Sequence, residues 1–182
     1  ADGPDHLLGY RSPDFVYRPP NAPIRVLLKN YRLSDDIAFR FSNRGWAEWP
    51  LTAEKYDRWV SRAGGEVLSL FMDFETFGEH QWKESGIFEF FETWVERHLS
   101  HRGGEFVTPA QAIAKLPHRD LLSSPRTISW ADEARDVSAW QGNDLQRDAL
   151  KKLLALEAPV RTSDSPELRS HFRRLTTSDH FY

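Results

Sequence analysis

The sequence of 182 residues contains no cysteine. That absence excludes disulfide bonds, thiolate catalysis and cysteine-ligated zinc sites, although it leaves the cellular compartment open. A basic excess is also missing, because 24 Lys and Arg face 27 Asp and Glu and leave a net charge of −3, whereas generic nucleic-acid binders are basic. No apolar run approaches the roughly 18 residues of a membrane span. We therefore expect neither nucleic acid nor a membrane among the partners.

Common catalytic signatures are missing as well. The sequence has no His-Glu-x-x-His metal motif, no Gly-x-Ser-x-Gly nucleophile elbow and no glycine-rich nucleotide loop. We accordingly expect no metal and no cofactor. Methionine is scarce too, since Met72 is the only one and the sequence starts at Ala1, so we expect a portion of a longer chain.

Aromatic residues, in contrast, are abundant, with 12 Phe, 7 Trp and 5 Tyr. Hydrophobic residues make up 40% and charged residues 28% of the chain, which is typical of folded globular proteins. The length fits one domain, or one and part of another, but is short for a (β/α)8 barrel of about 250 residues. The rings are therefore expected in a core or at a ligand.

Residues 24–116 alternate between strand and helix patterns. Apolar runs predict strands at 24–29, 66–74 and 105–107. Capping signals and helical periodicity predict helices that begin at Ser34, Thr52, Ile87 and Thr108. This alternation is typical of parallel β/α units and predicts an α/β fold.

The pattern changes after residue 122. It predicts a strand at 126–130 and helices over 143–158 and 165–175. We therefore expect one domain over 1–122 and a second, helical part over 123–182.

Asp73 is the first candidate for a chemical role. It lies at the C-terminal end of the predicted strand 66–74, with Glu75 and His80 in the following loop, where β/α folds build their active sites. A carboxylic acid leaving an apolar strand is partly desolvated, which favours its neutral form, as a general acid requires. Alternatively, Asp73 only caps the next turn, Glu75 is a surface acid and Trp82 is a packing lid rather than a stacking platform.

Two more groups of polar and aromatic residues occur near the end of the sequence. One surrounds Trp130 and Trp140, and the other is the tetrapeptide Asp179-His180-Phe181-Tyr182. The first is either an ion-paired structural loop or a rim that faces a saccharide. The second is either part of a site or a C-terminal tail. The spacing of the residues alone does not decide between these alternatives.

Several strings resemble one known family. Phe71-Met72-Asp73-Phe74-Glu75-Thr76-Phe77-Gly78-Glu79-His80-Gln81-Trp82 resembles the fourth conserved region of glycoside hydrolase family 57, in its α-amylase-type branch. Thr177–Tyr182 resembles the fifth conserved region. Further similar strings are Gly9–Pro13, Asn30–Arg40, Ile128–Asp132 and Asp136–Asp144. The resemblance thus covers essentially the whole chain.

The resemblance implies a partial (β/α)7 barrel, its C-terminal half, followed by α-helices. It implies a retaining glycosidase that cleaves α-glucans such as starch, glycogen or malto-oligosaccharides, with Asp73 as the catalytic acid/base. The resemblance also implies substrate contacts for Glu75, His80, Trp82, Trp130, Asp179 and His180.

One part of the family pattern has no match. The family's nucleophile is a Glu in a third conserved region, which lies N-terminal to every string quoted above, and no residue here corresponds to it. We therefore expect a fragment that carries the acid/base and is inactive alone. The alternatives are a non-catalytic α-glucan-binding relative and a structural module. The sequence does not distinguish an amylase from a branching enzyme, a glucanotransferase or a pullulanase.

Overall fold

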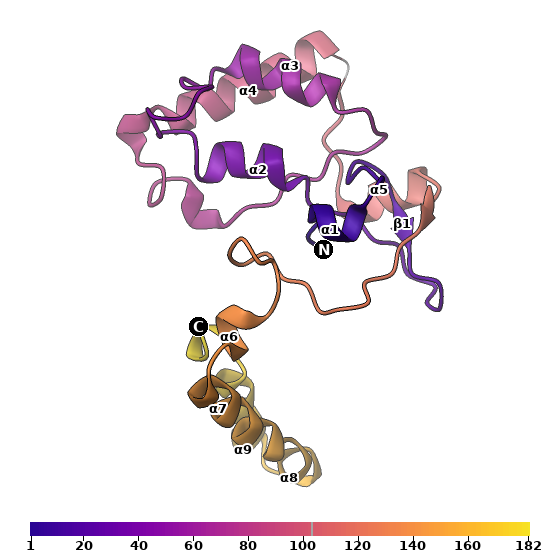
Figure 1. Ribbon diagram of the computed structural model, residues 1–182, viewed down its shortest axis with the longest axis vertical. Helices are drawn as coiled ribbons and strands as arrows, with labels where there is room; N and C mark the ends of the chain where they lie inside the picture. The colour runs from indigo at the N-terminus through magenta and orange to yellow at the C-terminus, as the bar shows by residue number, and fades with distance from the viewer. Residues whose placement is uncertain (103) are drawn as a thin grey trace. The chain divides into compact units, whose positions relative to one another are not determined.

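The computed structural model describes residues 1–102 and 104–182 (Figure 1). Contacts divide the chain into two compact units, Ala1–Ser124 and Pro125–Tyr182. The fold is mixed α/β and mostly helical, with one small two-stranded sheet. Whether 1–122 form part of a barrel and 123–182 a helical extension of it stays a prediction.

The first unit contains five helices, two short 3-10 turns and two short strands among the described residues. They are α1 (Asp5–Leu8), β1 (Tyr17–Arg18), α2 (Tyr31–Ala38), α3 (Ala53–Arg62), η1 (Phe74–Thr76), η2 (Lys83–Ser85), α4 (Ile87–Arg102), α5 (Pro109–Lys115) and β2 (Asp120–Leu121).

The helix starts follow local capping chemistry. Thr52 Oγ1 accepts the N–H of Lys55 at 3.3 Å and begins α3, as predicted. Thr108 and Gln111 form the predicted reciprocal capping box of α5, which satisfies two backbone donors that a helix N-terminus leaves unpaired.

The prediction for α2 is wrong at both ends of the helix. Asn30 caps this helix, because its Oδ1 accepts the N–H of Leu33 at 3.2 Å. Ser34 lies inside the helix, fully buried, and α2 ends at Ala38 rather than near Phe41. Asn and Ser are about equally good caps, so the residue types alone did not fix which of them takes that position.

The main core of this unit lies between α2, α3 and α4. Ile37, Tyr56 and Trp94, one from each helix, are almost completely buried. The rings of Tyr56 and Trp94 meet edge to face with centroids 5.1 Å apart, a favoured aromatic geometry. Helices α3 and α4 lie side by side (Figure 1), and the Tyr56 hydroxyl donates to the Leu33 carbonyl of α2 at 2.9 Å.

The predicted strands are not regular strands. Residues 24–29 and 66–74 make only isolated bridges, which place Lys29 in parallel between Asp2 and Ser69. In the part of the chain that the structure describes, the one ladder is parallel and pairs β1 with β2. A strand needs a continuous row of partner groups, whereas the backbone N–H groups of Glu66 and Val67 both bond the Asp14 carbonyl. The predicted strands at 105–107 and 126–130 are also wrong, since both segments are irregular.

The second unit is built from short helices. They are α6 (Ser138–Gln141), α7 (Asp144–Ala155), α8 (Glu157–Thr162), α9 (Pro166–Leu175) and the turn η3 (Ser178–His180). Asn143 and Gln146 form the predicted capping box of α7, and Ser165 caps α9. The single helix predicted over 143–158 is divided after Ala155, because Pro159 has no N–H to donate to the Ala155 carbonyl.

None of the helices in the described part of the chain has both the length and the apolar character needed to cross a membrane.

Two adjacent glycines after α3 provide a test of this packing. A methyl group on Gly65 would lie 2.0 Å from the Asp14 carbonyl oxygen, whereas one on Gly64 would meet nothing within 4 Å. We expect Gly65→Ala to lower the free energy of unfolding by about 1–3 kcal/mol, as overpacking does. Gly64→Ala should change it by less than about 1 kcal/mol. Urea unfolding of both variants measures the difference, and equal effects would contradict the close approach of Asp14 to Gly65.

Candidate active site

Asp73 is the half-buried residue that immediately precedes η1. Its backbone is extended, with φ −66° and ψ 145°, and its carbonyl oxygen accepts the N–H of Thr76 at 3.1 Å. Its carboxylate makes no capping hydrogen bond to η1. The alternative that Asp73 serves only as a turn cap is therefore not what the structure shows.

Residues 73–82 form a loop that closes on itself through its backbone. The His80 N–H donates to the Glu75 carbonyl at 3.0 Å, and the Gln81 N–H donates to the Thr76 carbonyl at 3.0 Å. In return the Gly78 N–H donates to the Gln81 carbonyl at 2.9 Å. Gly78 has φ +105°, which a residue with a side chain rarely adopts. The loop therefore has a defined shape of its own.

The loop separates buried from exposed side chains. Thr76 and Gln81 are almost completely buried, whereas Glu75 and His80 are exposed. Trp82 is 68% exposed and Phe74 is 95% exposed. The structure thus brings Asp73, Glu75, His80 and Trp82 together in one loop, with two carboxyl groups, an imidazole and an indole available to a ligand.

Helix α2 holds both ends of this loop region. Ser34 Oγ accepts the N–H of Phe71 at 3.1 Å, two residues before Asp73. Gln81 Nε2 donates to the Ala38 carbonyl at 2.8 Å. These contacts are side chain to backbone and lie 37 and 43 residues apart in sequence, so no local pattern predicted them.

Asp14 fixes the N-terminal end of α2 through the capping residue Asn30. Its Oδ1 accepts a hydrogen bond from Nδ2 of the capping residue Asn30 at 3.0 Å. Burial raises the pKa of the Asp14 carboxyl above the ordinary 3.8, and hydrogen bonds from Asn30 and Ser12 oppose the rise. The charged form is disfavoured because a buried carboxylate loses its hydration.

Two buried acids contact basic side chains in ways that the sequence did not indicate. Lys29 Nζ lies 3.3 Å from Asp35 Oδ1, with both side chains less than a tenth exposed. Between α3 and α4, Asp57 accepts from His98 Nδ1 at 2.9 Å and lies 3.6 Å from Arg97 Nε. These acids look like ordinary surface residues in the sequence, because burial by distant segments gives no local signal. Among the described residues, no group of three or more His, Asp or Glu side chains could hold a metal ion.

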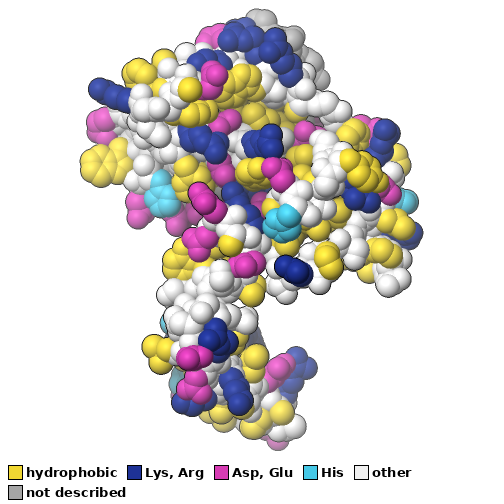
Figure 2. Space-filling model, viewed as in Figure 1, with side chains coloured by type: hydrophobic (Ala, Val, Ile, Leu, Met, Phe, Trp, Pro, Cys, Tyr) yellow, Lys and Arg dark blue, Asp and Glu magenta, His cyan; other side chains and the backbone are white. Residues whose placement is uncertain are grey.

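The face in Figure 2 carries acidic and basic side chains intermingled with hydrophobic ones. No large area of one charge sign dominates this view.

The second unit holds the remaining predicted site residues. Trp130 is 53% exposed, and its ring meets that of Trp140 edge to face at 6.2 Å. Trp140 in turn meets the ring of Tyr182 at 5.7 Å. Asp179 and His180 are exposed residues of η3, and His180 Nε2 lies 3.2 Å from the Arg174 carbonyl oxygen.

The loop that carries Trp130 is stabilised by hydrogen bonds between its own residues. The Ser129 N–H donates to the Arg135 carbonyl at 2.9 Å, and Arg135 Nη1 donates to the Trp130 carbonyl at 3.0 Å. Asp132 and Arg135 have φ values of +53° and +51°, a conformation that costs residues with side chains about 1–2 kcal/mol. The bracing therefore maintains a shape that the free segment would avoid.

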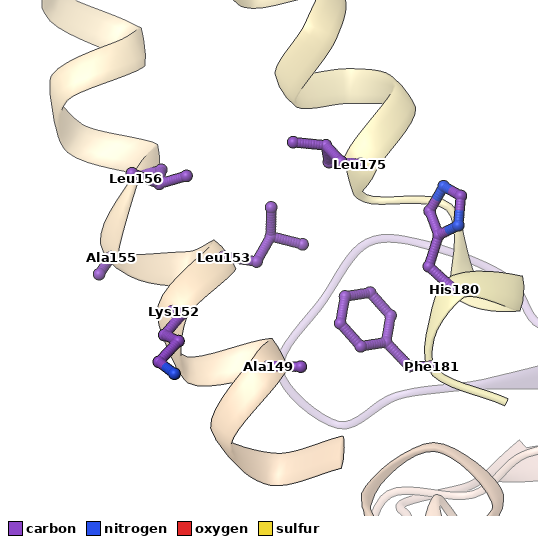
Figure 3. A pocket seen from close by; sticks show the side chains of 8 residues that line it. All are labelled: Ala149, Lys152, Leu153, Ala155, Leu156, Leu175, His180 and Phe181. Atoms are coloured by element: carbon purple, nitrogen blue, oxygen red, sulfur yellow. The ribbon is translucent and has the colours of Figure 1, made fainter. Parts of the chain in front are cut away.

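A cavity of about 580 Å³ also lies in this unit, between α7 and the segment that follows α9. Leu153 and Phe181 project into it from opposite sides (Figure 3). Its lining is largely apolar, with Lys152 and His180 as the polar members. The cavity contains no carboxyl group and offers no acid chemistry.

Comparison with known proteins gives a consistent picture. The model of glycosyl hydrolase family 57 matches residues 1–125. A protein of Methanocaldococcus jannaschii named "Putative alpha-amylase" is 41% identical over 192 aligned positions, which cover 100% of this chain and 41% of the relative. The chain thus spans about two fifths of the length of that relative. No solved structure matches.

The raised pKa of Asp14 makes a prediction about pH. Because the folded state holds this proton more tightly, it binds more protons than the unfolded state between pH 3.8 and the raised value. The free energy of unfolding of the wild type, relative to Asp14→Asn, should therefore fall as the pH rises through that window.

Urea unfolding at a series of pH values measures this difference. Asp5 provides a control of opposite sign, because hydrogen bonds from Arg32 and Tyr31 lower its pKa. Relative to Asp5→Asn, the wild type should gain stability as the pH rises toward 3.8. A difference for Asp14→Asn that does not change with pH would contradict the burial of the acid.

Proposed function

The chain belongs to glycosyl hydrolase family 57, and on that premise we propose that it supplies the acid/base half of a retaining α-glucan hydrolase. Asp73 is the proton donor and acceptor. The substrates are starch, glycogen and malto-oligosaccharides, and the second carboxyl group comes from another part of a longer protein. The name of the Methanocaldococcus relative, which is more than twice as long, supports this reaction.

The single observation that carries the proposal is the state of Asp73. Asp73 is half-buried, its carboxyl group is not used to cap η1, and it stands in a loop that is closed by its own backbone. A general acid needs this combination, because the group has to be placed within hydrogen-bond reach of the leaving oxygen and must not be engaged in a structural cap.

The chemistry has two steps. A carboxylate nucleophile attacks the anomeric carbon while Asp73 gives its proton to the departing glycosidic oxygen, which leaves a glycosyl-enzyme intermediate. Asp73, now ionised, takes a proton from water, and that water displaces the enzyme carboxylate with net retention. This mechanism needs the two carboxyl groups about 5–5.5 Å apart.

The remaining predicted residues bind the glucan. Glu75 and His80 offer an acceptor and a ring nitrogen to sugar hydroxyl groups, and the exposed ring of Trp82 offers a stacking face. Trp130, Asp179 and His180 are assigned to glucan contacts of the second unit. The parallel bridges of Asp2, Lys29 and Ser69 support assigning residues 1–122 to the C-terminal half of a (β/α)7 barrel.

Replacement of the acid tests the assignment. In the complete gene product that contains this chain, Asp73→Asn should lower kcat on soluble starch by about 10²–10⁴-fold, because the leaving oxygen is no longer protonated. Glu84→Gln, which removes an exposed carboxylate of η2, should leave kcat unchanged. Release of reducing sugar measures both, and full activity of Asp73→Asn would refute the assignment.

A second candidate is a family relative that binds α-glucans without cleaving them, and the exposure of Trp82 and Trp130 favours binding of this kind. Trp82→Ala should weaken binding of maltoheptaose to the complete protein by about twofold to tenfold, the equivalent of one aromatic contact. Calorimetric titration provides the measurement. Trp49→Ala, at a half-exposed ring outside the loop, is the control.

Starch hydrolysis by the wild type distinguishes the hydrolase from the glucan-binding protein. Weaker binding by Trp82→Ala together with no starch hydrolysis by the wild type would favour the binding protein. Wild-type protein with no affinity for maltoheptaose would exclude both candidates and leave a structural module.

A further inference from the structure

We propose that Ser34 and Gln81 are positioning residues that fix Asp73 by holding its loop on helix α2. The inference rests on the proposed function of Asp73 as the acid/base. Neither residue touches the substrate in this proposal, and each acts through the backbone of residues 71–82.

Ser34 is fully buried and uses its hydroxyl twice. The Oγ donates to the Asn30 carbonyl at 2.8 Å, one turn back in the same helix, and accepts the N–H of Phe71 at 3.1 Å. Within α2 this hydroxyl is not needed for helix formation, because Asn30 already supplies the cap. Its contact with Phe71 fixes the backbone two residues before Asp73.

Gln81 fixes the other end of the loop. It is 4% exposed, and its Nε2 donates to the Ala38 carbonyl at 2.8 Å. Ala38 is the last residue of α2, so its carbonyl has no partner within the helix. Among the described residues, no donor reaches Gln81 Oε1. The hydrogen bond from Nε2 therefore ties residue 81 to a carbonyl that the helix itself leaves unpaired.

The two contacts set the geometry of the loop together. Ser34 and Ala38 are one helical turn apart, or about 6 Å along the axis. Residues 71 and 81, if extended, would be separated by about 33 Å. The segment between them therefore has to return on itself, as a compact loop with neighbouring ends does. Asp73 lies two residues after Phe71, which Ser34 holds. A displacement of the Phe71 backbone would therefore also displace Asp73.

Helix α2, which carries Ser34 and the Ala38 carbonyl, is itself held in place by three contacts. Asn30 caps its start and is bonded by Asp14, the Tyr56 hydroxyl holds the Leu33 carbonyl, and Ile37 is fully buried in the core. The core of the first unit thus fixes α2, and α2 fixes the loop. The side chains proposed to contact substrate, such as Glu75 and His80, are nevertheless exposed.

Loss of the Ser34 or the Gln81 hydrogen bond is expected to displace Asp73 together with its loop. In the complete gene product, Ser34→Ala and Gln81→Met should each lower kcat on malto-oligosaccharides by about 10–100-fold, the range that a displacement near 1 Å produces. KM should change less than kcat, because the glucan contacts assigned to Trp130, Asp179 and His180 lie outside this loop. Gln81→Met keeps a side chain of similar length at this buried position, but it should lower the thermal stability, because the Ala38 carbonyl loses its donor.

Matched variants separate positioning from general weakening of the fold. Ser61 Oγ donates to the Asp57 carbonyl one turn back in α3, as Ser34 Oγ does in α2, but makes no contact with the loop. Gln111 bonds a backbone group at the start of α5, as Gln81 does at the end of α2. Ser61→Ala and Gln111→Met, which remove the corresponding bonds at exposed positions, should therefore retain wild-type kcat.

Comparing kcat/KM for substrates with good and poor leaving groups distinguishes a positioning role from a purely structural one. A nitrophenyl malto-oligoside releases a good leaving group that needs little protonation, whereas an unsubstituted malto-oligosaccharide needs the acid. Ser34→Ala and Gln81→Met should lower kcat/KM strongly on the second substrate and weakly on the first, as Asp73→Asn should. If Ser34→Ala does not fold, Gln81→Met decides the question.

The outcomes are distinguishable. If Asp73→Asn abolishes activity but Ser34→Ala and Gln81→Met behave like their controls, the positioning role is wrong and the proposed function stands. If the two variants lose kcat equally on both substrates, their effect is structural and the positioning role is again wrong. If Asp73→Asn keeps full activity, the proposed function fails and this inference fails with it.

Discussion

The hydrogen bonds that satisfy the two ends of α2 determine where the candidate chemistry can lie. A helix leaves donors unpaired at its start and carbonyls unpaired at its end. Here Asn30 serves the start and is itself bonded by Asp14, and the Gln81 side chain serves the Ala38 carbonyl at the end. The same bonds that complete the helix therefore position a loop some forty residues further along the chain.

Local sequence signals located most of the helix caps, although the equally local cap at Asn30 was missed. The caps at Thr52, Thr108, Asn143 and Ser165 each join a side chain to a backbone group three residues away, and all four were predictable. The strands were not, because a strand depends on partners from elsewhere. The apolar run 66–74 finds one bridge at Ser69, and several of its other N–H groups bond Asp14 and Ser34 instead.

The candidate site shows the same division between local and distant information. The loop around Asp73 was recognisable as a string of residues, but the string did not reveal which of its side chains face inward. Ser34 was expected to be a cap, and its burial against Phe71 follows from the packing of α2 rather than from its neighbours in sequence. The buried pair of Lys29 and Asp35 was missed for the same reason, since neither residue type indicates burial.

A flexible loop is a poor place for a proton donor, because small displacements cost large factors in rate. This loop reduces that difficulty by dividing its side chains between two tasks. Thr76 and Gln81 are buried and tie it to the first unit, so Glu75, His80 and Trp82 can remain exposed for a ligand. Asp73, half-buried between these two groups, is held by the backbone on either side while its carboxyl group is spared from capping. The arrangement fits the role proposed for Asp73, because a permanent structural partner would compete for the oxygen atoms that have to donate and recover a proton.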